Sequence, residues 1–357
     1  MRRPEPLPSI DDVRAQLAEH GITHVGVTTA EVLDAARRAL HERRDEGLDG
    51  GMAFTYRDPD RSTDPRRAVE GARSVIVVAR PYLTEVDPQR PGSAAGPRAR
   101  VARYAWVDHY APLRTALREV SRRIRRSDHR AVAFADDNSL VDRAVAHRAG
   151  LGWYGKNANL LLPGAGSWFV LGSIVTTAEY EPTPGPAPEG CGSCERCIDD
   201  CPTDAIVAPG VIDANRCISW ILQRPGSIPI GYREAIGDRI YGCDDCQDAC
   251  PISVRLGHRS TIGLDPSADA WIDAIELLET DDAWIDRRYG HWYVSDRDFR
   301  WVRRNALVVV GNVADPADSR VLRVLDRYRA HVDPILVEHA GWAIDRLRER
   351  SRVGAPS

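Results

Sequence analysis

A single lysine, Lys156, stands in a sequence with 48 basic residues, so every other basic side chain is an arginine. A compact ammonium differs chemically from a planar guanidinium, so this lysine suggests a chemical role; chance survival is the alternative. The chain also lacks an apolar run of the ~18–20 residues that a membrane span needs. No apolar stretch follows the arginine pair Arg2 and Arg3. We therefore expect no export signal, no membrane partner and a cytoplasmic protein.

Cysteine, by contrast, is concentrated in one segment. All eight cysteines lie between positions 191 and 250, and the first four follow the pattern C-x2-C-x2-C-x3-C-P. The last three follow C-x2-C-x3-C-P, with Cys217 upstream. This is the bacterial two-cluster ferredoxin pattern, in which the fourth cysteine of a run ligates the other cluster. The predicted ligand sets of two [4Fe–4S] clusters are Cys191, Cys194, Cys197 and Cys250, and Cys201, Cys217, Cys243 and Cys246.

Two other uses of cysteine fit less well. Zinc also takes C-x2-C pairs, but two runs that each end in C-P are poorly explained by tetrahedral zinc. Disulfides need an oxidising compartment, and the sequence predicts no export. A pure electron carrier would need little more than the cysteine segment, so the rest of the 357 residues favours a redox enzyme.

Strands and helices alternate in the first half of the chain. Apolar runs predict strands over 23–28, 74–79, 131–135 and 168–176, and amphipathic runs predict helices over 11–20, 30–46, 110–126 and 141–149. This alternation predicts an α/β domain over residues 1–180. A proline-rich linker at 181–190 opens a ferredoxin-like domain over 181–255. We expect residues 256–357 to form an all-α, HEAT-like tail, because 301–313 and 335–347 look like two helical repeat units.

One motif is a decoy. Residues 150–155 match G-x-G-x-x-G, which binds a dinucleotide when it follows a strand and opens a helix. Here it follows a predicted helix, so we do not expect a nicotinamide or flavin on this segment.

Several segments together resemble the epoxyqueuosine reductase family. They are GMAFTYRDPDRSTDPRRAVEGARSVIVV (51–78), RYAWVDHY (103–110), AGLGWYGKNANLL (149–161), CISW (217–220), RNALVVVGN (304–312) and DPILVEHAGWAIDRL (333–347), together with the cysteine runs. The resemblance implies a cytoplasmic enzyme that reduces epoxyqueuosine to queuosine at the wobble position of tRNA anticodons. It implies cobalamin as a cofactor beside the two clusters. The implied fold resembles the reductive dehalogenases, with cobalamin on the N-terminal domain and a helical tail that helps to hold the tRNA anticodon stem-loop. We expect a monomer that takes electrons from an external low-potential donor.

The resemblance aligns Asp136 with the proton-donating aspartate of the family. Removing an epoxide oxygen takes two electrons and two protons, and an acid near neutrality needs a raised pKa, most simply by burial. A helix N-cap is the alternative role for this residue.

Five further residues are expected to lie at cobalamin, together with Asp136. Lys156 and Asn157 match the family's G-K-N motif, Arg57 and Tyr104 match positions that face the same cofactor, and Ser219 closely follows the ligand position Cys217. Structural hydrogen bonding is the alternative for each of them.

Arginine-rich segments suggest where tRNA phosphates would bind. A basic helix carries Arg118, Arg122, Arg123, Arg125 and Arg126, although a solvated face is an equal alternative in so arginine-rich a chain. In the tail, the matching motifs single out Arg303, Asn305 and Arg346.

The sequence departs from the family pattern beside Asp136. The family shows Asp-Ser/Thr-x-Pro-x-x-Glu-Arg, whereas this chain has Asp137, Ser139 and Asp142 at the altered positions, and Ala111 follows Tyr110. These changes bear on the predicted identity of the substrate more than on the predicted identity of the cofactors. The alternatives are a divergent cobalamin and iron–sulfur reductase acting on another small electrophile, or a two-cluster electron-transfer protein.

Overall fold

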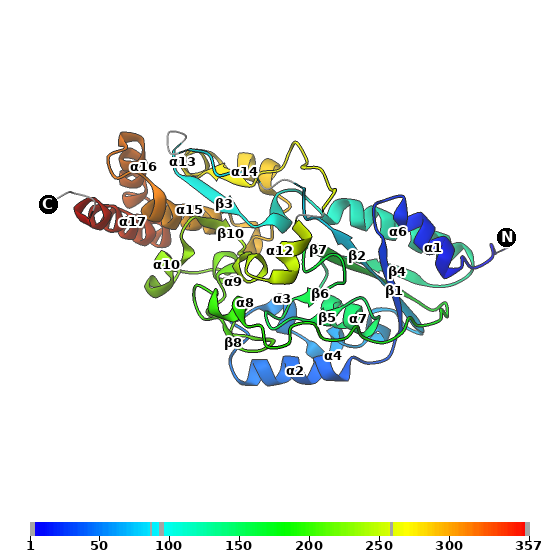
Figure 1. Cartoon of the computed structure of the whole chain (residues 1–357). Helices are drawn as coiled ribbons and strands as arrows, with labels where there is room; N and C mark the ends of the chain where they lie inside the picture. Colours follow the sequence, from blue (N-terminus) through cyan, green and yellow to red (C-terminus); the bar gives the residue numbers. More distant parts are fainter. Residues whose placement is uncertain (1–3, 86–87, 93–95, 258–259, 354–357) are drawn as a thin grey trace.

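The computed structural model describes residues 4–85, 88–92, 96–257 and 260–353. The molecule is elongated, with helix α1 (Ile10–Ala18) towards one end and helix α17 (Pro334–Val353) at the other (Figure 1). Within the described ranges, no helix is both long and apolar enough to span a bilayer.

The N-terminal part is built on a four-stranded sheet. Its strands run in the order β1 (His24–Thr29), β2 (Ser74–Pro81), β7 (Phe169–Thr176) and β4 (Ala131–Phe134). All four coincide with predicted strands, yet every pairing is antiparallel. Alternating strands and helices usually indicate parallel crossovers, so the expected α/β alternation holds along the chain but not in the direction of the strands.

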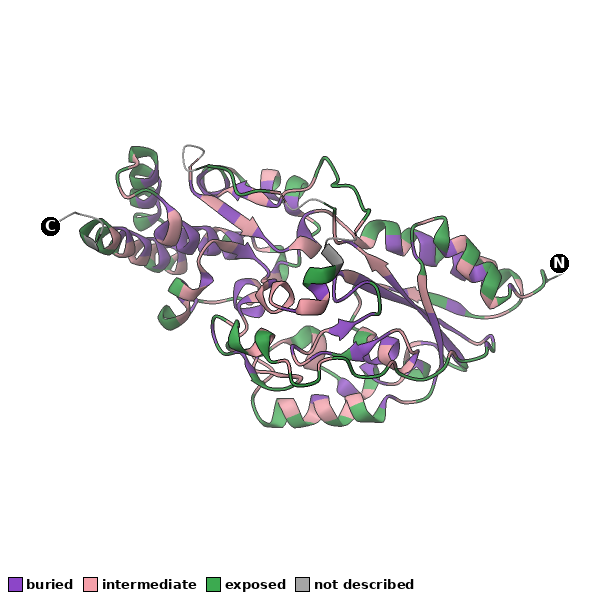
Figure 2. Cartoon of the chain, viewed as in Figure 1, coloured by how far each residue is buried: buried purple, intermediate pink, exposed green. Residues whose placement is uncertain are grey.

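Helices cover both faces of this sheet, because its strands are apolar on both sides. Ile76 and Val78 of β2 face a core with α1 and α6 (Tyr110–Arg126), while Val75 and Val77 face the core that includes α7 (Asp142–Arg148). The two central strands, β2 and β7, are buried over nearly their whole length (Figure 2). The other helices of this part are α2 (Asp34–Asp45), α3 (Ala53–Tyr56), α4 (Pro59–Ser62), α5 (Pro65–Ala68) and the 3-10 turn η2 (Arg103–Ala105).

The cysteine segment consists of short elements joined by tight loops. They are α8 (Arg196–Asp199), β8 (Ile206–Ala208), β9 (Val211–Ile212), α9 (Ile218–Gln223), α10 (Ile230–Ile236), β10 (Arg239–Tyr241), α11 (Asp245–Asp248) and α12 (Pro251–Gly257). The hairpin of β5 (Trp153–Tyr154) and β6 (Leu160–Leu161) contributes to the same region. It occupies the segment that carries the G-x-G-x-x-G match, and no helix opens there.

A second sheet joins the three parts of the chain. Strand β3 (Arg98–Val101) pairs in parallel with β10 and antiparallel with β11 (Trp271–Asp273). One strand therefore comes from each of the three predicted domains. The three-domain division remains a prediction, and any such domains share backbone hydrogen bonds.

The C-terminal part is helical after β11. This strand corrects the expected all-α fold of residues 256–357, because it pairs with β3 in the second sheet. It contains α13 (Ala274–Glu279), α14 (Asp282–Tyr289), the 3-10 turn η3 (Ser295–Arg297), α15 (Arg300–Val313), α16 (Ser319–Arg329) and α17. Helices α15 and α17 cross closely: a Cβ at Gly311 would lie 2.9 Å from the Cα of Ala343. Pro334 begins α17 and Asp333 caps it, as a proline at the first helical position favours.

Candidate functional site

Four cysteine thiols enclose a cavity on one side of the cysteine segment. Cys191 and Cys194 lie on the loop into α8, Cys197 lies within α8, and Cys250 lies between α11 and α12. Together with apolar side chains such as Leu161 they line a cavity of ≈ 130 Å³. The pKa of Cys197 is raised to about 11, first by burial and then by the neighbouring thiols of Cys250 and Cys191. This group, called the outer thiol group below, is one of the two sets that the crossed pattern predicts.

The other four cysteines form the inner thiol group, which consists of Cys201, Cys217, Cys243 and Cys246. Burial raises the pKa of Cys243 to about 12, with contributions from Asp245 and Cys217. Burial also raises the pKa of Cys217, to which Cys201 contributes, and that of Cys246, to which Cys243 and Cys217 contribute. These mutual effects require the four thiols to lie close to one another, as ligands of one cluster must.

The chemistry of both groups fits iron–sulfur clusters. All eight cysteines are free thiols. The backbone N–H of Ala205 donates to the Sγ of Cys201 at 3.2 Å, and the N–H groups of Ser219 and Trp220 bond the sulfur of Cys217. Hydrogen bonds to the sulfurs stabilise thiolate and help to set cluster potentials. Among the described residues, no three His, Cys, Asp or Glu side chains converge on a single-ion site; the outer thiols instead surround a cavity.

The G-K-N loop contacts both thiol groups. The Nζ of Lys156 lies 3.2 Å from the carboxylate of Glu195, a residue that stands between Cys194 and Cys197 in the sequence. Lys156 also lines the outer cavity. Buried Asn157 donates from its Nδ2 to the carbonyl of Cys246 at 3.0 Å. The sequence assigned these two side chains to cobalamin. In the structure the ammonium of Lys156 pairs with Glu195 and the amide of Asn157 bonds the main chain at Cys246, and a role of either residue at cobalamin remains a prediction.

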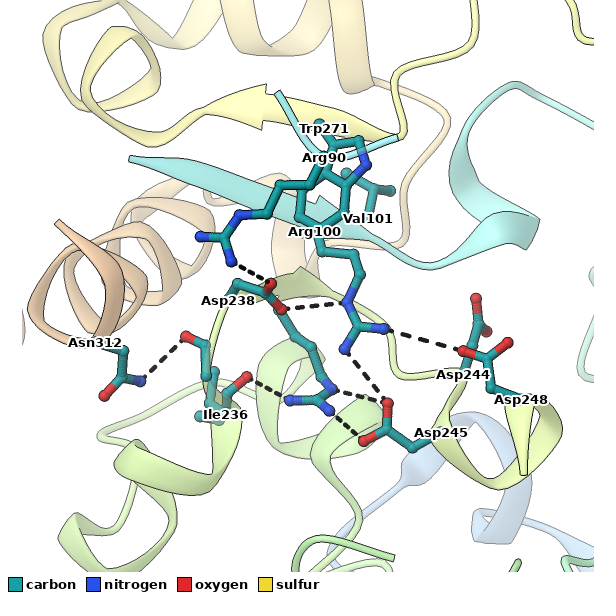
Figure 3. Close-up of polar contacts among 12 residues, drawn as sticks. Arg90, Arg100, Val101, Ile236, Asp238, Asp244, Asp245, Asp248, Trp271 and Asn312 are labelled. Atoms are coloured by element: carbon teal, nitrogen blue, oxygen red, sulfur yellow. Dashed lines mark hydrogen bonds and ion pairs between the residues drawn. The ribbon is translucent and has the colours of Figure 1, made fainter. Parts of the chain in front are cut away.

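A network of paired charges fixes the loop that carries the inner cysteines (Figure 3). Asp245 accepts from both Arg239 and Arg100, and Arg100 also donates to Asp238 at 3.2 Å. The backbone N–H of Arg103 donates to buried Asp244 at 2.7 Å. Aspartates between cysteines would add charge beside a cluster, and the arginines of β3 and β10 offset it.

The same residues surround a cavity of ≈ 290 Å³. Arg103 also donates from its guanidinium to Asp248 at 2.6 Å, and its guanidinium lies 4.8 Å from the ring centre of Trp168. The network thereby joins the cysteine loop to the segment that continues into Tyr104.

Asp136 lies on the loop between β4 and α7, in a left-handed backbone conformation with φ of 55°. Its side chain is exposed, yet surrounding protein raises its pKa through desolvation, with smaller contributions from Asp108 and Asp137. The carboxyl of Asp136 is therefore accessible to solvent and at the same time flanked by protein. The pKa values of half-buried Tyr110 and buried Tyr241 are raised first by desolvation and also by the carboxylate of Asp136, so these side chains belong to the same region.

The altered positions beside Asp136 have distinct local roles. Asp137 accepts a hydrogen bond of 2.8 Å from the backbone N–H of Ser139, whose hydroxyl accepts from Arg61 at 3.3 Å. Asp142 begins α7, and its pKa is raised to about 8 by burial and by the charges of Asp136 and Asp137. Ala111 begins α6 beside Tyr110 and is exposed. The region around Asp136 therefore holds a second carboxyl that is mainly protonated near neutrality.

The remaining predicted cofactor residues lie in different settings. Tyr104 is held by a hydrogen bond of 2.9 Å from Gln223 of α9. Ser219 is half-buried on α9, next to the ligand position Cys217. Arg57 is exposed, and its side chain has no partner among the described residues. The roles of Tyr104, Ser219 and Arg57 at cobalamin remain predictions.

The tail residues are engaged within the protein. Asn305 is 1 % exposed and donates to the carbonyls of Leu222 and Ile240. It cannot reach an RNA from this position, which corrects the prediction for it. Arg303 pairs with Asp282, and Arg346 pairs with Glu234 at 2.8 Å. An RNA role for these two arginines remains a prediction that competes with the pairs.

Two features went unnoticed in the sequence. Arg304 is fully buried, and its guanidinium donates to four carbonyl oxygens around the end of α9, including those of Leu222 and Gly226. Phe54 and Tyr293 are 42 % and 45 % exposed, and their ring centres lie 6.4 Å apart although they come from opposite ends of the chain. The motif RNALVVVGN contains Arg304 and was the only sign of its role. No sequence pattern indicated the pair of Phe54 and Tyr293.

Crossed thiol groups beside an α+β core and a helical tail define a two-cluster iron–sulfur oxidoreductase. Residues 190–253 match the family model of the 4Fe-4S double cluster binding domain, and residues 62–137 match that of epoxyqueuosine reductase QueG, DUF1730. An epoxyqueuosine reductase of Xanthomonas campestris is 36 % identical over 362 residues, covering 96 % of this chain and 98 % of that protein. One from Lactococcus garvieae is 31 % identical, covering 96 % and 97 %. The chain belongs to the epoxyqueuosine reductase family.

Solved structures agree with this assignment. An epoxyqueuosine reductase from Bacillus subtilis, with its catalytic aspartate loop swung out of the active site, superposes with a TM-score of 0.86. It is 28 % identical and the match covers 95 % of this chain and 90 % of that one. An epoxyqueuosine reductase with an epoxyqueuosine-modified tRNA-Tyr stem loop gives a TM-score of 0.85 at 28 % identity, covering 98 % and 94 %.

Proposed function

We propose that this enzyme reduces epoxyqueuosine to queuosine at the wobble position of tRNA anticodons, with electrons from two [4Fe–4S] clusters and cobalamin. The observation that carries the proposal is the pair of crossed thiol groups in a chain that aligns with curated epoxyqueuosine reductases over nearly its full length. The reaction removes the epoxide oxygen as water, which takes two electrons and two protons. Clusters deliver electrons singly, so the site must collect two of them.

The region around Asp136 suits a large cofactor. It combines the exposed carboxyl of Asp136, the phenols of Tyr104, Tyr110 and Tyr241, and the inner thiol group, whose Cys217 directly precedes α9. Cobalamin, when bound, supplies a nucleophilic cobalt centre that can hold two electrons. In this proposal Tyr104 and Ser219 line its site beside the inner cluster, and Arg57 offers a cation to its polar rim.

Asp136 is the proposed proton donor. Its raised pKa keeps a larger fraction protonated near neutrality than an ordinary aspartate has, and its accessible carboxyl can reach a substrate. Asp137 accepts from the backbone of Ser139 and shapes the loop, which leaves Asp136 free of a capping role. The B. subtilis relative, whose catalytic aspartate loop swings out of its active site, supports a catalytic loop at this position.

The proposed RNA contacts shift from the tail to the aromatic pair. Sequence-specific RNA recognition stacks unpaired bases on aromatic side chains. Phe54 and Tyr293 provide two exposed rings, and the main chain of Tyr293 is hydrogen-bonded to the hydroxyl of Tyr241, which lies near Asp136. We assign a base next to the modified nucleotide to this pair, with Arg303 and Arg346 as more distant phosphate contacts.

Other parts of the proposal follow from the chemistry. A tRNA substrate places the enzyme in the cytoplasm, and an external low-potential donor must supply the electrons. The predicted domain division (residues 1–180, 181–255 and 256–357) and a monomeric state belong to the same proposal; residues 1–3 and 354–357 lie outside the described residues.

A divergent reductase of another small electrophile is the second candidate. The observation that favours it is the altered surroundings of Asp136, where Asp142 is a second carboxyl with a pKa of about 8. The side chains that a substrate would contact beside Asp136 therefore differ from those of the family pattern.

The test is anaerobic turnover by the reconstituted full chain with cobalamin and a chemical reductant. The proposal expects conversion of epoxyqueuosine to queuosine in tRNA, measured by mass spectrometry of the digested nucleosides. Conversion of small epoxides or organohalides with no reaction on the tRNA would favour the second candidate instead.

A further inference from the structure

The only lysine of the chain lies beside the outer thiol group. Lys156 lines the cavity that Cys191, Cys194, Cys197 and Cys250 enclose. Its side chain is 18 % exposed, and its Nζ lies 3.2 Å from a carboxylate oxygen of Glu195, whose side chain is 56 % exposed. The cation is therefore more deeply placed than the anion that pairs with it.

The backbone of this loop is fixed on both sides of the lysine. The carbonyl of Lys156 accepts from the N–H of Gly210 at 2.8 Å, and the N–H of Gly155 donates to the carbonyl of Asn159 at 2.8 Å. Asn157 is tied to Cys246. The ammonium is thus held by a rigid loop rather than by a mobile surface side chain.

The charges around the outer cavity are unbalanced. Apart from the thiols, the charged side chains among the described residues that line it are Lys156 and Arg255, and both are cations. The inner group differs, because the aspartates between its cysteines are paired with arginines. Apart from its thiols, the lining of the outer cavity is therefore positive, and Glu195, which lies outside that lining, pairs with one of its two cations.

A positive charge at this place has a definite effect on a cluster. Each reduction step adds one negative charge to the cluster, no bond breaks, and a nearby cation stabilises the reduced state. Net charge around a cluster and hydrogen bonds to its sulfurs are among the quantities that set its potential. Partial burial strengthens the effect, because a half-buried charge is screened less than an exposed one.

We infer that Lys156 is a positioning residue for electron transfer, which raises the reduction potential of the cluster on Cys191, Cys194, Cys197 and Cys250. This cluster takes one electron at a time from the external low-potential donor, and the lysine makes that step more favourable. The inference rests on the clusters and not on the substrate. It can therefore fail while the proposed function holds, and the proposed function can fail while the inference holds.

The experiment is an anaerobic redox titration of the holoprotein followed by electron paramagnetic resonance, with iron counted in each preparation. In Lys156→Met, the equilibrium constant for one-electron reduction of one cluster should fall about tenfold, which is 59 mV for a one-electron couple. The other cluster should keep its potential. Lys156→Arg retains the charge and should restore most of the shift, whereas a role in shape alone would leave this variant like Lys156→Met.

Two further variants make the result decisive. Arg196→Met removes a cation from the same cysteine loop at an exposed position, and should leave both potentials unchanged. Glu195→Gln removes the anion beside the lysine, and should raise the same potential that Lys156→Met lowers. Unchanged potentials in Lys156→Met would overturn the inference, as would equal shifts of both clusters. If Lys156→Met lost iron, a potential in Glu195→Gln that stayed constant or fell would overturn it.

Discussion

The side-chain amide of Asn157 donates a hydrogen bond of 3.0 Å to the main-chain carbonyl of Cys246. The same side chain accepts from the backbone N–H of Asn159 at 3.1 Å, so it joins two loops that are far apart in sequence. Residues that orient ligands without touching the metal commonly control how firmly the metal is held. The G-K-N motif therefore supports the main chain at Cys246, one of the predicted ligands of the inner cluster.

Asn157→Leu should weaken the retention of the inner cluster. The substitution leaves a buried carbonyl without its donor, which costs about 1–3 kcal/mol. Iron per chain after incubation with a chelator, measured against time, should fall faster than in the wild type. Ser193→Ala, an exposed change within the cysteine segment, is the matched control and should release iron at the wild-type rate. Equal rates for Asn157→Leu and the wild type would contradict a supporting role.

Arg304→Met should destabilise the junction between the tail and α9. The guanidinium donates to four carbonyl oxygens, those of buried Ile221 and Leu222 and of half-buried Arg224 and Gly226. Leaving a buried carbonyl unpaired costs about 1–3 kcal/mol before relaxation. The melting temperature should fall by roughly 5 °C or more in scanning calorimetry. Arg329→Met removes an exposed arginine from α16 and should change it little. If the melting temperature of Arg304→Met stayed within about 1 °C of the wild-type value, Arg304 would not stabilise this junction.

The stability gained by Asp142→Asn should depend on pH. Burial raises the folded-state pKa of Asp142 to about 8, so between pH ~4 and ~8 the folded chain holds a proton that the unfolded chain releases. Stability is therefore lost as the pH rises through this window, and the amide variant avoids that loss. Its melting temperature relative to the wild type should rise by about 2 °C or more from pH 5 to pH 9. The same difference at both values would mean that Asp142 ionises normally.

Removing the aromatic pair should weaken binding of the RNA. Stacking on an aromatic side chain contributes about 1–3 kcal/mol per base, so Phe54→Ala or Tyr293→Ala should raise the Kd for a tRNA stem-loop about five- to one-hundred-fold. Fluorescence anisotropy with a labelled stem-loop measures this. Leu322→Ala removes an exposed apolar side chain of α16, far along the chain from both rings, and should bind like the wild type. Unaltered binding in both aromatic variants would place the RNA elsewhere.

Much of the fold and site followed from local sequence pattern. The cysteine spacing predicted two thiol groups because short loops must bring thiols together, and both groups assemble as expected. Apolar runs located all four strands of the large sheet. The capping aspartate Asp333 and Pro334 located the start of α17, because their effects act within a few residues.

Contacts between residues far apart in the chain could not be predicted from the sequence pattern. The antiparallel direction of the large sheet depends on how distant strands meet, and apolar runs carry no direction. The cobalamin role of Lys156 and Asn157 was predicted from a motif alone, which carried no sign of their protein partners 39 and 89 positions away. Asn305 illustrates the same limit: polar residues on a helix with a basic motif can face a buried junction as well as an RNA.

The most direct test of the account is single-turnover conversion of epoxyqueuosine in tRNA by Asp136→Asn. The account predicts loss of conversion by about 100-fold or more, the range that general acid catalysis contributes, with both clusters present by iron count. Asn138→Ala, an exposed change on the same loop, should convert the substrate at close to the wild-type rate. Wild-type conversion by Asp136→Asn would contradict the central claim, because the acid that the site presents would then not take part in the reaction.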